Sequence, residues 1–301
     1  MKILLVALLA GIVLPCSGQK KRQLQESLYT IADGFTGKVG IYVRHLKTGQ
    51  EVAINADSLF STASMIKIPI TIGIFNAIEK GELDYGAVLT YHDSLASGIG
   101  EDIVGSLRGG ETISLAKLLM LMITTSDNTA SLWCQSLAGG GTAINAWLEA
   151  NGFRHTRVNS RTPGREADRE KYGWGQTTPR EMAELMTRIR NNEVITPRSS
   201  ERIYRNLIRI FWDGSSLSQI PPYVQVASKS GSLDQYRSEV VLVNAPHGDY
   251  VFCVIADEMN DRRWAPDNAG NVLLRNVSAL LWNYFEPASK WRPAKGIEEW
   301  R

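Results

Sequence analysis

Residues that bind metals or form disulfides are scarce in this sequence, which has three cysteines and four histidines among 301 residues. No two histidines are spaced as a metal-binding pair, and no cysteine shows metal-ligand spacing. The histidines are His45, His92, His155 and His247. We therefore expect no metal site.

Long basic runs and long apolar runs are also missing. The longest basic run is Lys20-Lys21-Arg22 and the net charge is only +2, so we do not expect a nucleic-acid partner.

The one unbroken apolar stretch, residues 3–14, has 12 residues, whereas a helix that spans a membrane needs roughly 20. We expect no membrane span. With 44% hydrophobic and 21% charged residues, the chain is typical of a globular protein with one large core or two modest ones.

The N-terminus has the pattern of a secretory signal peptide. The basic Lys2 precedes the apolar stretch, and small residues follow it as far as Gly18. We expect cleavage near Gly18, which leaves residues 19–301 as the exported chain with a net charge of +1 after the loss of Lys2. A lipid anchor on Cys16 is less favoured, because Pro15 before it fits that signal poorly.

Export would leave two cysteines in a compartment where a disulfide can form. Cys134 and Cys253 lie in the apolar contexts SLWCQSL and YVFCVIA. These contexts favour two buried free thiols. A disulfide between the two is the alternative.

Hydrophobic periodicity predicts strands near both ends of the chain and helices in the middle. The expected strands are 38–46, 51–55, 224–230, 238–245 and 250–257, with a hairpin turn at 47–50, and the expected helices are 64–80, 114–124, 128–137, 179–190 and 270–285. Strands from both ends must share one sheet, so we expect an α+β fold. Its sheet lobe would be about 19–57 and 200–301, its helical lobe about 58–199, with a cleft between them.

Ser64 and Lys67, in STASMIKIP (61–69), are the first candidate catalytic pair. Three residues apart on a helix, they share one face, and a nucleophilic serine needs a base within reach. A lysine with its ordinary pKa of about 10.4 is a poor base, so this interpretation requires burial and a second nearby cation. The alternatives are a solvated surface lysine and a different nucleophile, Ser61, whose partner three residues on is Ser64 rather than a base. At the start of a helix, the Ser64 amide is also free to bind an oxyanion.

Ser126-Asp127-Asn128 lies between two apolar helical runs. Alone it is an ordinary polar turn or helix cap. In a functional interpretation, the Ser126 hydroxyl relays a proton to a leaving nitrogen and Asn128 binds a substrate carbonyl group.

Lys229-Ser230-Gly231-Ser232 closes the predicted strand VQVAS. Lys229 is a candidate for the second cation that Lys67 requires. Ser230 is a candidate for binding a substrate carboxylate, Gly231 would let a ligand lie against the strand, and the Ser232 amide is a second candidate oxyanion donor. A lone lysine at a strand end would carry no such meaning.

In order and approximate spacing, these three motifs resemble those of the class A serine β-lactamases and related penicillin-recognising enzymes. The resemblance covers nearly all of the mature chain. It implies a β-lactamase/transpeptidase-like fold, a three-layer α/β/α arrangement with an antiparallel five-stranded sheet beside an all-helical lobe. It also implies that Ser64 forms an acyl-enzyme, that Lys67 lies in the proton path and that Ser126 and Lys229 serve the leaving nitrogen. The amides of Ser64 and Ser232 would then stabilise the oxyanion.

One motif of that family is missing. Its members carry a glutamate in an Arg-x-Glu-x-x-Leu-Asn loop, and this glutamate activates the water that releases the acyl group. Counted forward from Ser126 or back from Pro179, the family's usual interval to this glutamate ends near Thr162 and Pro163. Arg161 is a candidate for the loop arginine, but no carboxylate follows two residues later.

Three nearby carboxylates are candidates for the missing base. A remodelled loop would have to present Glu166, Asp168 or Glu170, and the alternative is that all three are solvated charges among neighbouring basic residues. General base catalysis typically contributes about 10²- to 10⁴-fold. The sequence therefore supports acylation better than deacylation.

Arg237, eight positions beyond Lys229, is a candidate for binding a substrate carboxylate, as arginines of the neighbouring strand do in the family. A surface ion pair of Arg237 with Glu239 or Asp234 is the alternative.

Together these features predict an exported, monomeric serine hydrolase of the class A β-lactamase type that uses no metal or organic cofactor. A leader with this resemblance indicates the periplasm or secretion, and such an enzyme would confer antibiotic resistance. The alternatives are a D-alanyl-D-alanine peptidase-like or esterase acyl-transfer enzyme acting on peptidoglycan-type peptides, and a non-hydrolysing penicillin-binding or sensor protein.

Overall fold

The computed structural model describes residues 17–99 and 102–300. The expected leader, residues 1–18, lies outside them except for its last two residues, and so does Cys16. Within these two ranges, no helix combines the length and the apolar character needed to cross a membrane.

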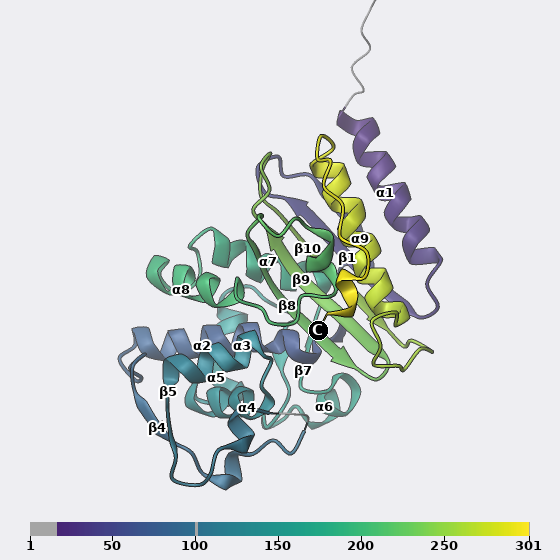
Figure 1. Cartoon of the computed structure of the whole chain (residues 1–301). Coiled ribbons are helices and arrows are strands. Elements are labelled where there is room, and N and C mark those ends of the chain that lie inside the picture. The colour runs from purple at the N-terminus through teal and green to yellow at the C-terminus, as the bar shows by residue number, and fades with distance from the viewer. Residues whose placement is uncertain (1–16, 100–101, 301) are drawn as a thin grey trace, which may run out of the picture.

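A five-stranded antiparallel sheet forms the centre of the fold (Figure 1). Its strand order is β2-β1-β10-β9-β8, so strands from both ends of the chain are neighbours, as the sequence predicts. The strands are β1 (Lys38–His45), β2 (Glu51–Ile54), β8 (Val226–Leu233), β9 (Tyr236–Val243) and β10 (Tyr250–Asp257). The smaller strands are β3 (Phe60–Ser61), β6 (Arg157–Val158) and β7 (Gly175–Thr177) in one sheet, and β4 (Val88–Thr90) and β5 (Thr112–Ser114) in another.

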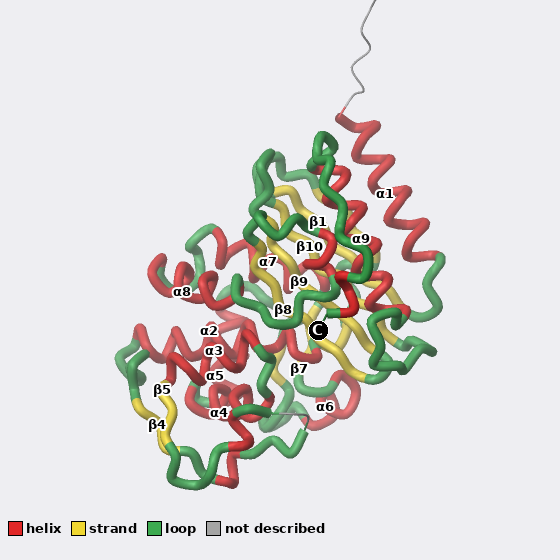
Figure 2. The backbone as a smooth tube through the Cα atoms, viewed as in Figure 1, coloured by secondary structure: helices red, strands yellow, loops and turns green. Residues whose placement is uncertain are grey.

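Helices cover both faces of the large sheet (Figure 2). The α-helices of the described residues are α1 (Ser17–Asp33), α2 (Lys67–Glu79), α3 (Leu115–Thr124), α4 (Asn128–Leu137), α5 (Gly140–Ala150), α6 (Glu166–Tyr172), α7 (Pro179–Arg190), α8 (Pro197–Leu207) and α9 (Ala269–Phe285). The 3₁₀ turns are η1 (Ala63–Ile66), η2 (Asp93–Leu95), η3 (Val104–Ser106), η4 (Ser216–Gln219) and η5 (Ile297–Glu299). The expected α+β, three-layer fold is confirmed.

Two hydrophobic cores follow from the alternation of side chains along the strands. Val241 and Val243 of β9 face α1 and α9, where they pack with residues such as Leu28 and Leu281. Val240 and Leu242 of the same strand face α7 and the helices beyond it. Helix α7 contacts β1, β9 and β10, and it also contacts α8, which in turn contacts α2 and α3 of the group formed by α2, α3, α4 and α5 (Figure 1).

The helix predicted at 64–80 begins later than expected. Ser64 lies in the 3₁₀ turn η1, and α2 starts at Lys67. Pro69 explains the difference, because it has no backbone N–H to donate to the carbonyl four residues earlier. The third position of α2 tolerates the proline, since the first four N–H groups of a helix have no partner inside the helix.

Four helices were not predicted from the sequence: α1, α5, α6 and α8. By contrast, Thr178 caps α7 and Pro179 opens it, as the capping pattern predicts. The two cysteines that the structure describes, Cys134 and Cys253, are buried and unpaired, which confirms the free thiols.

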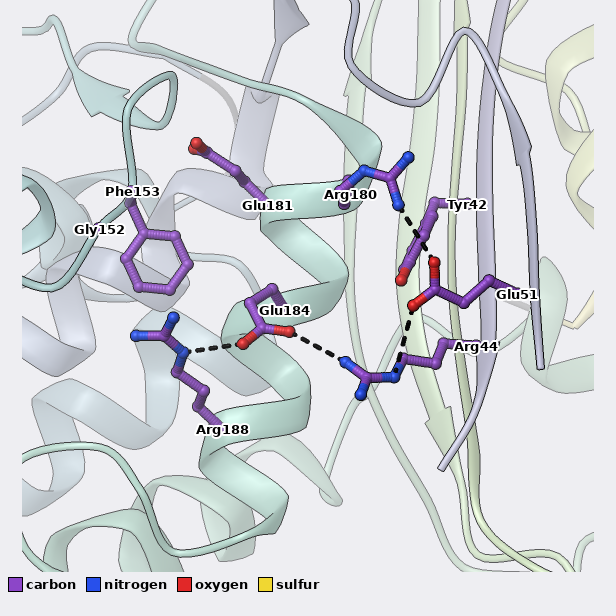
Figure 3. A pocket seen from close by; sticks show the side chains of 9 residues that line it. All are labelled: Tyr42, Arg44, Glu51, Gly152, Phe153, Arg180, Glu181, Glu184 and Arg188. Atoms are coloured by element: carbon purple, nitrogen blue, oxygen red, sulfur yellow. Dashed lines mark hydrogen bonds and ion pairs between the residues drawn. The ribbon is translucent and has the colours of Figure 1, made fainter. Parts of the chain in front are cut away.

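A ladder of ion pairs fixes α7 to the hairpin formed by β1 and β2 (Figure 3). Glu184 of α7 contacts Arg188 at 2.9 Å and Arg44 of β1 at 3.4 Å. Glu51 of β2 then contacts Arg44 at 3.7 Å and Arg180 of α7 at 3.4 Å. These side chains surround a cavity of about 240 Å³. Since each of them is paired with an opposite charge, we assign the ladder a structural role.

Glu184→Gln should weaken this junction, because it removes the charge that two arginines share while keeping the side chain's shape. Glu184 is 33% exposed, so we expect the free energy of unfolding to fall by at most about 1 kcal/mol. Urea unfolding measures the loss, which should shrink in 1 M salt.

The matched control is Glu201→Gln, which removes an exposed pair with Arg205 within α8. We expect this control to leave stability nearly unchanged. Equal effects of the two substitutions would show that the ladder does not stabilise the junction.

Candidate active site

The candidate nucleophile Ser64 lies in the tight turn η1, which packs against strand β8. Ala63 before it has a positive φ of 41°, which is uncommon for a residue other than glycine. Such backbone strain is found mainly at functional sites. Ser64 is partly exposed, whereas Ala63, Met65 and Ile66 of the same turn are buried. The turn therefore presents this one hydroxyl to solvent.

Lys67 is fully buried below Ser64. Its Nζ donates to Ser64 Oγ at 3.1 Å, Ser126 Oγ at 3.0 Å and Asn128 Oδ1 at 2.9 Å, and it also donates to the Ser126 carbonyl oxygen. All four acceptors are uncharged oxygens. Within the described parts of the chain, no carboxylate forms an ion pair with Lys67.

This environment favours the neutral amine. Burial lowers the pKa of Lys67 well below its ordinary value, and the charge of Lys229 lowers it further. The more distant carboxylates of Asp102 and Asp127 act in the opposite direction but do not cancel these effects. A lysine of lowered pKa is able to act as a base near neutral pH.

Ser126 connects the two lysines. Its hydroxyl accepts from Lys67 at 3.0 Å and from Lys229 at 3.1 Å. Its φ of 63° places it in the left-handed region, between the end of α3 and the start of α4. This conformation directs both the hydroxyl and the carbonyl group of Ser126 toward Lys67.

Two aspartates fix the loop that carries Ser126. Asp127 caps α4 by accepting from the Ala130 N–H at 2.7 Å, and its other oxygen accepts from the Val104 N–H at 2.8 Å. Asp102 accepts from the N–H groups of Asn128 and Thr129, each at 2.8 Å. Burial acts to raise the pKa of Asp102, but its hydrogen bonds together hold it below the ordinary value.

Lys229 is the second buried lysine, at 1% exposure. Its Nζ donates to Ser126 Oγ and, at 2.9 Å, to the carbonyl oxygen of Ser230. Burial lowers its pKa to about 7, although the carboxylate of Glu239 acts to raise it. The structure thus brings Ser64, Lys67, Ser126 and Lys229 into one chain of hydrogen bonds. The alternative of a solvated Lys67 at the surface is wrong, because the side chain is buried.

Gly231 has a packing role that the sequence did not suggest. A Cβ atom at this position would meet the Thr62 carbonyl oxygen at 2.7 Å and the Ala63 Cβ at 3.0 Å. A glycine is therefore needed for the turn that bears Ser64 to lie directly against β8.

Asn128 contacts Lys67 directly, and Ser230 and Ser232 follow Lys229 on β8. The Asn128 side chain accepts from Lys67 through Oδ1 and donates to the Ile99 carbonyl oxygen at 3.1 Å through Nδ2. Ser230 is partly exposed and Ser232 is exposed at the end of β8. Ser61, the rival nucleophile, is buried, and its Oγ accepts from the Ala63 N–H at 3.1 Å.

Arg237 is buried, at 2% exposure. The alternative of an ion pair with Glu239 or Asp234 at the surface is therefore wrong. Its guanidinium group donates to the Arg263 carbonyl oxygen at 2.9 Å and to the Tyr236 carbonyl oxygen at 2.8 Å. Trp264 stacks over it with the guanidinium carbon 4.6 Å from the ring centre. Glu239 instead accepts from Ser216 and Ser228 in the interior.

The three loop carboxylates lie on the short helix α6. Glu166 and Glu170 are exposed, and Glu166 accepts from the Gly164 N–H at 3.1 Å. Asp168 pairs with Arg165 at 2.9 Å. No hydrogen bond or ion pair within 17–99 and 102–300 joins any of the three to Ser64 or Lys67.

Several residues of the site were not singled out from the sequence. Asp102 supports the loop, and Tyr236 donates its hydroxyl hydrogen to the Ser61 carbonyl oxygen beside the nucleophile turn. Asp127 belonged to a recognised motif but had no assigned role. No local pattern marks Asp102 or Tyr236, because their partners are far away in the sequence.

Comparisons with known proteins show which sequences and folds this chain resembles. A family model described as the beta-lactamase enzyme family matches residues 21–285. The β-lactamase VEB-1 of Pseudomonas aeruginosa is 21% identical over 303 aligned positions, which cover 94% of this chain and 97% of that protein. The solved structure of PBP-A is 25% identical, with a TM-score of 0.77 over 88% of this chain and 96% of its own. A mutant of PBP-A, solved as an acyl-enzyme complex with penicillin G, is 24% identical, with a TM-score of 0.77 over 90% and 97% of the two chains.

The lowered pKa of Lys229 predicts a pH-dependent stability. Lysine in the unfolded chain titrates near 10.5 and Lys229 in the fold near 7, so between these values the unfolded state binds more protons. Burial of Lys229 therefore destabilises the fold fully below pH 7, and this cost declines as the pH rises toward 10.5. Lys229→Met should raise the free energy of unfolding relative to the unsubstituted protein, and the gain should shrink between pH 7 and pH 9.5.

Urea unfolding across this pH range measures the gain, with the exposed Lys47→Met as the control. A difference between Lys229→Met and the unsubstituted protein that stays constant with pH would contradict the lowered pKa.

Proposed function

The chain belongs to the beta-lactamase enzyme family, and from this premise we propose that it is a serine hydrolase that opens β-lactam amides through an acyl-enzyme on Ser64. The observation that carries the proposal is the unbroken chain of hydrogen bonds Ser64–Lys67–Ser126–Lys229. It supplies a nucleophile, a base, a proton relay and a cation in one place.

In its neutral form Lys67 has a free lone pair, so across the same 3.1 Å contact its Nζ accepts from the Ser64 hydroxyl instead of donating to it. Acylation starts when the Ser64 proton moves along this hydrogen bond to Lys67. Ser64 Oγ then bonds to the carbonyl carbon of the lactam. The amides of Ser64 and Ser232 are the proposed donors to the oxyanion, and the close packing of η1 on β8 supports this pairing.

Release of the lactam nitrogen requires a proton. In our proposal the Ser126 hydroxyl gives its proton to the nitrogen as the carbon–nitrogen bond breaks. Ser126 receives in its place the one proton that Lys67 took from Ser64, so Lys67 returns to the neutral form. Lys229 orients the Ser126 hydroxyl and, by its charge, keeps Lys67 neutral before the reaction.

We assign substrate binding to Asn128, Ser230, Gly231 and Arg237. Asn128 holds Lys67 through Oδ1, and its Nδ2 is the group that would donate to a substrate carbonyl. For Arg237 to bind a substrate carboxylate, at least one donor must leave a backbone carbonyl group or be shared with it. Its stacking on Trp264 supports a fixed guanidinium plane beside the end of β8.

Deacylation is the weak step of this proposal, because Glu166, Asp168 and Glu170 have other partners or face solvent. This observation favours a second candidate function, an acyl-transfer enzyme of the D-alanyl-D-alanine peptidase or esterase kind, in which an amine or a slow water resolves the intermediate. A long-lived adduct, as in a penicillin-binding or sensor protein, has the same chemical basis. PBP-A, whose mutant is known as a penicillin G acyl-enzyme, shares the fold.

We further propose that residues 19–301 are the exported, monomeric catalytic domain, with the site between a sheet lobe and a helical lobe. Its location would be the periplasm or the medium after cleavage near Gly18. The apolar stretch 3–14 and the small residues that follow it as far as Gly18 support the assignment.

Intact-mass spectrometry of the protein with a penicillin tests the acyl-enzyme. We expect a mass gain equal to one penicillin, absent in Ser64→Ala, and at least about 100-fold slower in Lys67→Met because the base is lost. Equal mass gains in Ser64→Ala and the unsubstituted protein would contradict the proposal. A gain that vanishes while hydrolysed drug accumulates supports the β-lactamase, and a lasting gain supports the acyl-transfer candidate.

Substitutions on α6 show whether a loop carboxylate activates water. From their exposure and pairing, we expect Glu166→Gln, Asp168→Asn and Glu170→Gln each to change the decay of the adduct less than twofold. If the adduct of one variant decays at least tenfold more slowly while its acylation rate is unchanged, the substituted residue is the base.

A further inference from the structure

Two neighbouring aromatic side chains are exposed in the segment that joins α8 to η4. Phe211 is 54% exposed and Trp212 is 44% exposed. Their ring centres lie 4.9 Å apart in an edge-to-face arrangement. Single exposed aromatic residues are common, but this pair offers a continuous apolar surface at a fixed position.

Hydrogen bonds hold the pair beside Ser126. The Phe211 N–H donates to the Thr124 carbonyl oxygen at 3.0 Å, and the Trp212 indole N–H donates to the Thr125 carbonyl oxygen at 2.8 Å. Both carbonyl groups belong to the end of α3, where a helix leaves its acceptors unpaired. Thr125 directly precedes Ser126, so the indole is fixed one residue away from the proposed proton relay.

The same segment continues to the strand that carries Lys229. The Ser216 N–H donates to Glu239 Oε2 at 3.0 Å, and the Ser228 hydroxyl donates to Glu239 Oε1 at 3.1 Å. Ser228 directly precedes Lys229 on β8, which is an edge strand of the sheet. Residues 211–216 therefore connect the neighbour of Ser126 to Glu239 and Ser228, beside the edge strand β8 that carries Lys229.

We propose that Phe211 and Trp212 form an apolar subsite for an aromatic or bulky apolar group on the leaving-nitrogen side of the substrate. This inference rests on the proposed function, in which Ser126 and Lys229 serve that nitrogen. Aromatic rings bury a large apolar area and prefer edge-to-face or offset contacts, so such a substituent gains binding energy there. The subsite selects between substrates that share the same reacting amide.

Two cephalosporins test this subsite. They have identical acylamino side chains and carry either a methyl or a styryl group at carbon 3, on the ring that contains the lactam nitrogen. The second-order rate constant of Ser64 acylation is measured for each by rapid quenching and intact mass. Each rate constant is divided by that compound's rate of alkaline hydrolysis, which removes differences in intrinsic reactivity.

The styryl compound should acylate the unsubstituted protein about tenfold faster after this correction. Trp212→Ala and Phe211→Ala should each bring the styryl-to-methyl ratio close to one. Trp212→Phe keeps a ring and loses the indole N–H, and it should keep most of the ratio. Tyr29→Ala is the matched control, because Tyr29 is an exposed aromatic residue on α1, on the other face of the sheet, and should leave the ratio unchanged.

Each outcome decides the matter. A ratio that is unchanged in both alanine variants overturns the subsite and leaves the acylation of Ser64 standing. A ratio lost in Trp212→Phe as fully as in Trp212→Ala also overturns it, since the hydrogen bond and not the ring would then be responsible. No acylation of Ser64 by either compound overturns both the subsite and the proposed function.

Discussion

The proposed active site depends on the burial of two lysine side chains beside two serine hydroxyls. Placing ammonium groups in the interior without carboxylate partners is costly. Here uncharged oxygens of Ser64, Ser126, Asn128 and Ser230 satisfy the donors. The cost appears as lowered pKa values, and a lowered pKa is what makes a lysine a base. The burial that lowers the pKa of each lysine amine, and so would make it reactive, therefore also lowers the stability of the fold.

The rest of the fold holds these four side chains in place. Two of the residues with positive φ, Ala63 and Ser126, lie beside or within the site, and Gly231 lets the turn that carries Ser64 touch the sheet. Asp102 and Asp127 fix the loop between α3 and α4 through backbone N–H groups. Farther away, the ion-pair ladder around Glu184 fastens α7 to the first hairpin. Lys67 on α2 and Lys229 on β8 therefore both reach Ser126 from two parts of the chain that are supported separately.

Much of this arrangement could be predicted from the sequence, and the parts that could not have identifiable reasons. Alternating apolar residues predict the strands, and the three motifs predict that Ser64, Lys67, Ser126 and Lys229 meet. Other features depend on partners far along the chain: Arg237 is covered by Trp264, and Asp102 binds the N-terminus of α4. The orientation of the carboxylates on α6 also depends on how residues 158–177 pack, for which no local pattern exists. The late start of α2 follows from Pro69, but the 3₁₀ turn before it comes from packing against β8.

Direct titration of Lys67 tests the central claim of this account. In protein labelled with ¹³C at the lysine Cε positions, the Lys67 resonance is assigned from its absence in Lys67→Met and followed by NMR as a function of pH. The account predicts a midpoint well below the 10.5 of an ordinary lysine, because burial and the charge of Lys229 both lower the pKa of Lys67. A midpoint near 10.5 would mean that Lys67 is an ammonium group at neutral pH and is not the base that activates Ser64.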